Sequence, residues 1–233
     1  MAAEPTVAIN ASNLFSLGAN FHAQGSTTRT VLDRAMIQDA NGNEECETMI
    51  NSRDEVTANY DYCNAVPAIG TDLATLLTKF GDVHGGYKVT QLVIEFAAGQ
   101  YAKVSITGHQ HAAATHAAGL PAGYADVSAA VIAGAGFGVP TFTGVTLGTD
   151  ATPASATITF SMNHVDVLAA DGTHFVGKNL TPTAEISVAY EGVPTTAQPM
   201  TGWTTDSYGG DDSNSEFDKY EVTAHRYFDL ATA

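Results

Sequence analysis

Hydrophobic and polar residues alternate along several segments of this chain, and the alternation defines its expected elements. In the run TITFSM, Ile158, Phe160 and Met162 occupy every second position, and hydroxyl side chains fill the positions before each of them. A period of two is typical of a strand that buries one face. The segments 55–62 and 185–190 alternate in the same way. The pattern therefore predicts a mainly β protein.

One block of this sequence occurs twice. Residues 39–63 align without a gap with residues 169–193, at a constant offset of 130. The dipeptides Asn-Gly at 41–42 and Asp-Gly at 171–172 fall at the same place in each copy, and both suit a tight hairpin turn. We therefore expect a β-hairpin in each copy. Further identities are Ala40 with Ala170, Glu55 with Glu185 and Tyr60 with Tyr190.

A later strand also recurs, at a different offset. The segments 102–111 and 218–227 align at an offset of 116. Their identical residues are Lys103 with Lys219, Thr107 with Thr223 and His109 with His225. The smaller offset means that the second copy is shorter between its middle and last strands.

The extra residues of the first copy have a helical pattern. Apolar side chains recur at i, i+3, i+4 and i+7 from Leu73 to Phe80, Thr71 can cap the start, and Gly81 can end the last turn. We expect a helix over 71–80. The second copy has a polar, glycine-rich loop in its place.

These patterns predict two tandem, quasi-repeated units that form β-sandwiches or barrels, one of them with a flanking helix. The expected regions are an N-terminal arm at 1–26, a first β unit at 27–111, an Ala/Gly-rich connecting arm or loop at 112–154, and a second β unit at 155–233. The connection is too long for an ordinary loop. It could be a linker, a projecting loop or extra strands that pair with a neighbouring subunit, and we expect a partly ordered arm.

The charge of the chain excludes one class of function. Its 233 residues include 25 acidic and 9 basic side chains, for a formal net charge of −16. A protein that holds nucleic acid needs clustered Lys and Arg against the phosphates. We therefore expect a surface that repels nucleic acid.

The N-terminus and the cysteines point to a protein made in the cytoplasm. The chain begins without a basic segment followed by an apolar one, so no signal peptide is expected, and no apolar run approaches the length of a membrane span. Cys46 and Cys63 correspond to Val176 and Val193 in the second copy, so we expect two reduced thiols packed like small apolar residues.

No group of residues predicts catalysis. His109, His111 and His116 resemble a metal site, but the strand face that holds the first two is polar, and a third converging ligand is missing. The chain also lacks a G-x-S-x-G sequence and a phosphate-binding loop. We expect no enzyme activity, no cofactor and no bound metal.

The second copy and its counterpart carry a resemblance to a known family. The segments SMNHVDVLAADG (161–172) and TAEISVAYEG (183–192) resemble those of major tail tube proteins of long-tailed bacteriophages. The likeness extends from Thr27 to Phe228. It implies a β-sandwich with one flanking helix and a long loop, a unit that some members carry twice.

The resemblance also implies a function. It implies homo-oligomeric rings, trimeric or hexameric, that stack into the hollow tube of a virion tail. Other tail proteins are possible partners, and DNA passes through the channel without specific binding. No membrane is involved.

The two hairpins are our candidates for the channel lining. The acids expected to contribute are Asp39, Glu44, Glu45, Asp166 and Asp171. The alternative is that these carboxylates lie on an outer surface.

Two other classes of function remain open. One is another phage structural protein, of the distal tail, the baseplate or the capsid decoration. The other is a carbohydrate-binding β-sandwich, in which Trp203 and Tyr208 would stack on sugar rings.

Overall fold

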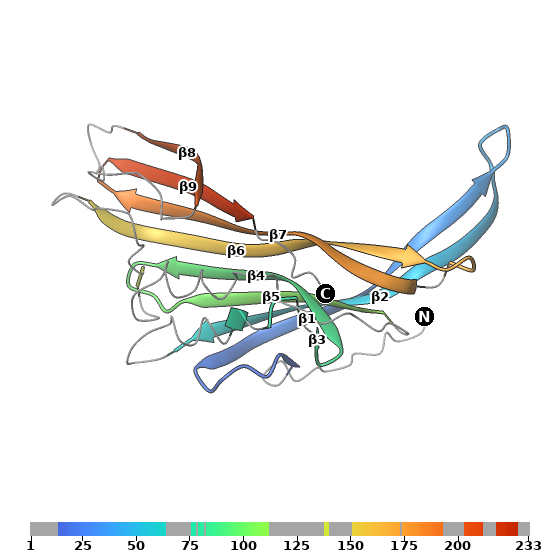
Figure 1. Ribbon diagram of the computed structural model, residues 1–233, viewed down its shortest axis with the longest axis horizontal. Coiled ribbons are helices and arrows are strands. Elements are labelled where there is room, and N and C mark those ends of the chain that lie inside the picture. Colours follow the sequence, from blue (N-terminus) through green and yellow to red (C-terminus); the bar gives the residue numbers. More distant parts are fainter. Residues whose placement is uncertain are drawn as a thin grey trace.

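The computed structural model describes residues 14–63, 76–77, 79–81, 83–111, 138–139, 151–172, 174–192, 203–211 and 218–227. Its strands form one antiparallel sheet (Figure 1), which confirms the mainly β prediction. The strands are β1 (Phe21–Gln38), β2 (Glu44–Tyr62), β3 (Val83–His84), β4 (Tyr87–Ala97), β5 (Lys103–His111), β6 (Thr152–Leu168), β7 (His174–Glu191), β8 (Thr204–Asp211) and β9 (Lys219–Tyr227).

The sheet runs through both halves of the chain. Its order is β1-β2-β5-β4-β6-β7-β9-β8, and the short β3 pairs with β4. The first four strands of this order come from the N-terminal half and the last four from the C-terminal half. Because β4 pairs with both β5 and β6, the sheet continues from one half into the other. The described strands therefore form one sheet, in place of the two sandwiches that we expected.

The two long hairpins pair in the same register. Ala23 lies opposite Tyr60 in β1–β2, and Pro153 lies opposite Tyr190 in β6–β7, which is the same pairing at an offset of 130. Register shifts interrupt β1–β2 after Ala23, Val31 and Ile37, and they interrupt β6–β7 after Pro153, Ser161 and Val167. Each irregularity of one hairpin thus has a counterpart in the other.

The remaining strands follow the same rule at an offset of 116. Gln91 lies opposite Thr107 in β4–β5, and Ser207 lies opposite Thr223 in β8–β9. A register shift precedes each of these pairs. β8 lies where we expected only a loop, because its pairing with β9 overrides the low strand propensity of a glycine-rich segment.

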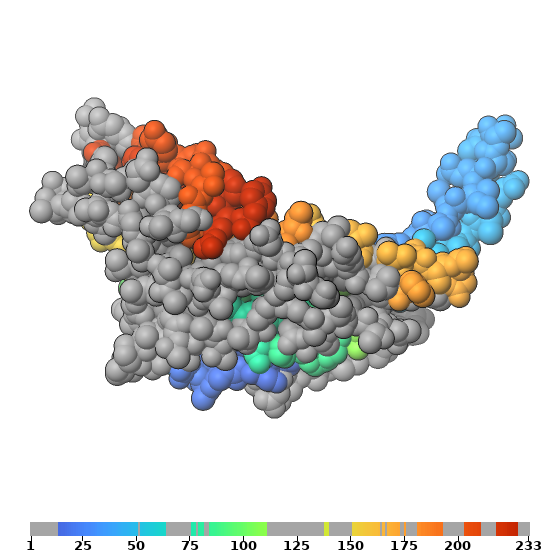
Figure 2. Space-filling view, in the orientation of Figure 1, coloured from blue at the N-terminus to red at the C-terminus, as the bar shows by residue number. Residues whose placement is uncertain are grey.

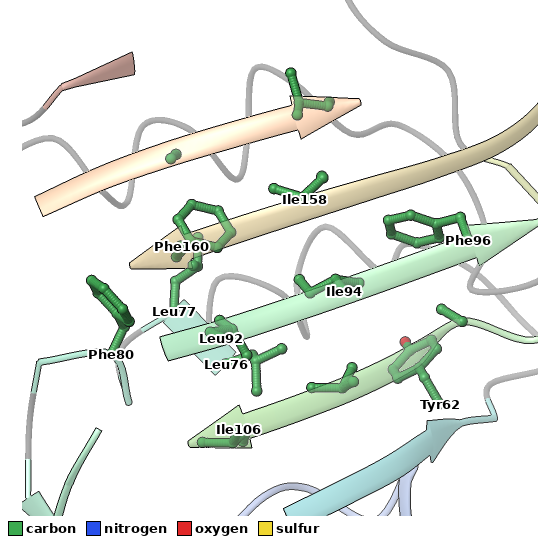
Figure 3. Close-up of a cluster of buried hydrophobic side chains, with 14 of the residues drawn as sticks. Tyr62, Leu76, Leu77, Phe80, Leu92, Ile94, Phe96, Ile106, Ile158 and Phe160 are labelled. Carbon is green, nitrogen blue, oxygen red and sulfur yellow. The ribbon is translucent and has the colours of Figure 1, made fainter. Parts of the chain in front are cut away.

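One face of the sheet forms the apolar core. Leu92 and Ile94 of β4 lie opposite Phe160 and Ile158 of β6, and all four side chains are buried (Figure 3). Phe80 packs near Phe160, with 6.3 Å between the ring centroids. Full burial of each such side chain contributes roughly 1.5–3 kcal/mol.

Only part of the expected helix at 71–80 lies among the described residues. Leu76 and Leu77 are helical and buried, and they belong to the same apolar cluster. Gly81 has a φ of 75°, a left-handed conformation that suits a glycine after the last helical turn. The expected arm at 1–26 is described only from Leu14 onward, and most of the expected connection at 112–154 lies outside the described residues. β1 nevertheless begins at Phe21 and β6 at Thr152.

Both long hairpins extend beyond the rest of the sheet. β5 pairs with β2 only as far as Arg53, and β9 pairs with β7 only as far as Thr183. We call the extension of β1–β2 (33–50) arm A and that of β6–β7 (163–180) arm B. Arm A projects clear of the body in blue and cyan (Figure 2).

Candidate functional site

The outermost strands of the sheet are β1 and β8. Among the described strands, β1 pairs only with β2 and β8 pairs only with β9. A strand at a sheet edge presents a row of backbone N–H and C=O groups that another strand can bind. The two edges are therefore candidate sites for association with another chain.

The junction between β4 and β6 shows how such an association can form. These two strands come from the two halves of the chain and pair from Gln91–Ser161 to Ala97–Ser155. β4 corresponds to β8 at an offset of 116, and β6 corresponds to β1 at an offset of 130. The two strands that meet inside the chain thus have their counterparts in the outermost strands β1 and β8. We call the outer sides of β1 and β8 the free edges, since no other described strand pairs with them.

The edges differ from the junction in their side chains. At the positions of the buried Ile158 and Phe160, β1 has Thr28 and Thr30, which are exposed. At the position of the buried Leu92, β8 has Tyr208, which is 69% exposed. The free edges are therefore polar or glycine-rich where the junction is apolar.

The second face of the sheet, which we call the polar face, carries more acidic than basic side chains. The strand residues opposite the core side are hydroxyl, amide or charged, with few apolar exceptions. Its acids are Glu55, Asp61, Glu95, Glu185, Glu191, Asp206 and Glu221, and its bases include Arg29, Arg53, Lys103 and Lys219.

Two shallow hollows lie on the polar face. One has a volume of about 490 Å³, and its lining includes Asn59, Asp61, Glu95 and Lys103. The other has a volume of about 350 Å³, and its lining includes Thr157, Thr159, Glu185 and Asp206. Both hollows are open to solvent and lined mainly by polar and charged residues, unlike the enclosed apolar sites that bind hydrophobic small molecules.

Hydroxyl groups connect neighbouring strands across the polar face. The Oγ1 atoms of Thr57 and Thr107 lie 3.1 Å apart. Their counterparts on β7 and β9 are Ser187 and Thr223, which form hydrogen bonds to other residues. Thr223 pairs with the hydroxyl of Ser207 at 2.7 Å. Ser187 donates to Glu221 at 2.8 Å. The face is thus held by its own polar contacts.

The histidines do not form a metal site among the described residues. His109 is buried and His116 lies outside the described residues. Nδ1 of His225 lies 2.5 Å from Oδ1 of Asp206. Within the described ranges, no group of three or more His, Cys, Asp or Glu side chains is placed to hold a metal ion.

No described helix has the length and apolar character needed to cross a membrane.

Of the five predicted channel acids, Asp39, Glu44 and Glu45 lie on arm A. Asp39 stabilises the turn, because its Oδ1 accepts the backbone N–H groups of Asn41 and Asn43, each at 2.8 Å. These bonds, with the side-chain bond from Asn43 foremost, lower the pKa of Asp39.

A charged network follows on the same arm. Arg34 donates to Glu44 at 3.0 Å and also binds Glu47. A hydrogen bond between the carboxyl groups of Glu44 and Glu47 raises the pKa of Glu44. The hydrogen bond from Arg34 lowers the pKa of Glu47. Glu45 is exposed.

The other two predicted acids, Asp166 and Asp171, lie on arm B. The backbone of Asp166 is opposite Gly177, and Asp171 is exposed in the turn. The structure therefore brings the five acids to two hairpin extensions, away from the broad part of the sheet.

Sequence reasoning missed the acids of the polar face. Glu55 and Glu185 stand out in the sequence only as identical residues of the repeat. The period of two nevertheless places their side chains on the other face of the strand from the buried Val56 and Ile186. The signal was the polar half of the same alternation that predicted the core.

The sugar-binding alternative loses its main aromatic residue. Trp203 is only 7% exposed and belongs to the apolar core, so its indole faces cannot serve as an open platform. Tyr208 is exposed but lies on the edge strand β8.

Cys46 and Cys63 are free thiols, and both are exposed. The expectation that they pack like small apolar residues is therefore wrong.

Comparisons with known proteins do not add a family. No protein-family model matches this sequence, and a search of curated proteins finds no match. The resemblance to tail tube proteins remains a prediction from the sequence.

Proposed function

We propose that this chain is a structural subunit of a virion tail tube and assembles head to tail, with β8 of one copy pairing with β1 of the next. The observation that carries the proposal is the β4–β6 junction, whose two strands have their counterparts at the free edges. The two halves of the chain would then act as quasi-equivalent units of a single repeating sheet.

The junction specifies the register of the proposed contact. Leu92 lies opposite Phe160 in the junction, so Tyr208 is expected opposite Thr30 of the next copy. By the same offsets, Gly209 is expected opposite Arg29. Main-chain hydrogen bonds between edge strands are a common basis for association.

Repetition of one head-to-tail contact generates a ring when the rotation closes. Closure also removes the two exposed edges of every subunit. A trimeric ring would have pseudo-sixfold symmetry, and a hexameric ring is the alternative. Rings that stack would form the hollow tube.

The polar face is the expected channel wall in such a ring. The core face is already covered, since Leu76, Leu77 and Phe80 belong to its apolar cluster. The polar face carries more carboxylates than basic side chains, which favours passage of DNA over retention of its phosphates. The five predicted acids on the arms would then lie at one rim of the ring.

Electron microscopy over a concentration series tests the proposal. We expect rings or hollow tubes of uniform bore from the purified protein, and the ring views give the subunit number. A protein that remains monomeric at every concentration, with or without a crowding agent, would contradict the proposal and favour a decoration protein.

A further inference from the structure

Arms A and B carry most of the large apolar side chains that are exposed. Ile37 is 64% exposed on arm A, and Phe175 is 72% exposed on arm B. The others on or beside the arms are Leu32, Met36, Met49, Val165 and Val167. Apolar side chains gathered on a projecting element are typical of a surface that becomes buried on association.

The tip of arm B contacts arm A within the chain. A Cβ atom at Gly172, in the turn of arm B, would lie 2.7 Å from Cγ2 of Ile50. Ile50 lies at the base of arm A, opposite Asp33. Figure 1 shows the turn between β6 and β7 close to the base of the β1–β2 extension.

The tip of arm A has the same local structure but no such contact among the described residues. Gly42 has a φ of 83° and Gly172 a φ of 82°. The N–H of each glycine donates to the carbonyl three residues earlier, at 3.0 Å for Gly42 and 2.9 Å for Gly172. A Cβ atom at Gly42 would meet nothing described within 4 Å.

We infer that arm A docks on arm B of a second copy of this chain, with the tip around Gly42 against Leu180. The offset of 130 that relates Gly42 to Gly172 also relates Ile50 to Leu180, which pairs with Asn163 at the base of arm B. The residue at the receiving position is therefore apolar in both arms.

The direction of this contact agrees with the proposed edge pairing, on which the inference rests. Within the chain, β6 joins β4 and the arm of the joining half rests on the arm of the receiving half. Between copies, the one that supplies β1 would also supply the tip of arm A. The copy that supplies β8 would receive that tip at Leu180. Each interface would thus consist of a strand pair and an arm contact.

Cross-linking with a short bifunctional maleimide tests the inference in the background C46V/C63V, which introduces the valines found at the corresponding positions of the second copy. The test pair is Asn41→Cys on one tagged chain and Leu180→Cys on another. The reference pair for the intrachain contact is Asp171→Cys with Ile50→Cys. The reference pair for the edge is Tyr208→Cys with Thr30→Cys, again on separate chains.

We expect the intrachain pair to bridge within monomers, and both intermolecular pairs to give covalent dimers only in the assembled protein. If the edge pair cross-links and the Asn41–Leu180 pair does not, the arm inference is wrong and the ring proposal stands. If the protein stays monomeric and neither pair cross-links, both fail. Absence of the intrachain bridge would also overturn the inference, because the contact from which it is drawn would not exist in solution.

Discussion

The β4–β6 junction and the two free edges are counterparts in position, but they differ in chemistry. The junction places Leu92 against Phe160 and Ile94 against Ile158, all buried. The edges have exposed Thr28 and Thr30 on β1, and on β8 they have tyrosine and glycine at the corresponding places. A contact that forms during folding is apolar, whereas a contact proposed to form between folded chains is polar.

The difference follows from the states in which each surface must persist. The junction strands are tethered in one chain, and their facing edges stay paired in the folded protein. The edge strands are exposed in every unassembled subunit, and an apolar edge would promote pairing with any available strand. The Oγ1 of Thr30 donates to Asp54 at 2.6 Å, so this hydroxyl group has a hydrogen-bond partner before assembly. Backbone pairing and correct register then provide the specificity.

The largest expected effect is on the stability of the junction. Phe160→Ala should lower the free energy of unfolding by about 3–5 kcal/mol, because it opens a cavity among fully buried side chains. Thr30→Ala, at the corresponding position of β1, should cost about 1 kcal/mol or less, since only one exposed hydrogen bond is lost. Urea denaturation of monomeric protein measures both. Equal losses for the two variants would contradict the distinction between junction and edge.

A smaller effect tests whether the two halves have equivalent cores. Burial raises the pKa of Tyr60 and of its counterpart Tyr190 to about 12. An unfolded tyrosine releases its proton near pH 10, so between pH 10 and 12 the folded state binds more protons than the unfolded one. Stability should therefore fall across this range, by up to about 3 kcal/mol for each tyrosine.

Tyr60→Phe and Tyr190→Phe should each make this decline shallower, and by similar amounts. Denaturation curves collected from pH 9 to pH 12 provide the measurement, and the double variant should show the sum. A decline that is unchanged in both variants would mean that these hydroxyl groups are not responsible for it.

The smallest expected effect concerns the edge alone. A side chain at Gly209 would meet no described atom within 4 Å, so Gly209→Lys and Gly209→Glu should both fold. Placed opposite Arg29 of the next copy, lysine repels and glutamate attracts, by roughly 0.2–1 kcal/mol for a cross-strand pair. The two effects have opposite signs, so the association constant should differ between the variants by up to about 30-fold. Sedimentation at several concentrations measures it, and identical association of the two variants would exclude this register.

The strands that the sequence predicted well are those in which local pattern and tertiary pairing agree. Ile158 and Phe160 alternate with hydroxyl residues, and the turns at Gly42 and Gly172 require a positive φ that glycine adopts readily. The hairpins and their core face could therefore be predicted. The offsets of 130 and 116 also correspond to the paired registers of the strands.

The parts that were missed depend on contacts between distant segments. β8 is glycine-rich and forms only because β9 lies beside it. The single sheet depends on β4 meeting β6, for which no local pattern is sufficient. The placement of the predicted acids on projecting arms depends on how far β5 and β9 extend along β2 and β7.

The register of the proposed β8–β1 contact is the most direct test of head-to-tail assembly. Tyr208→Cys and Thr30→Cys, on separate tagged chains in the C46V/C63V background, should form an intermolecular disulfide on mild oxidation of the assembled protein. Gly209→Cys with Thr30→Cys is the matched control, because successive strand residues point to opposite faces. We expect cross-linking of the first pair and not of the control. Cross-linking of the control alone, or of neither pair in assembled material, would contradict it.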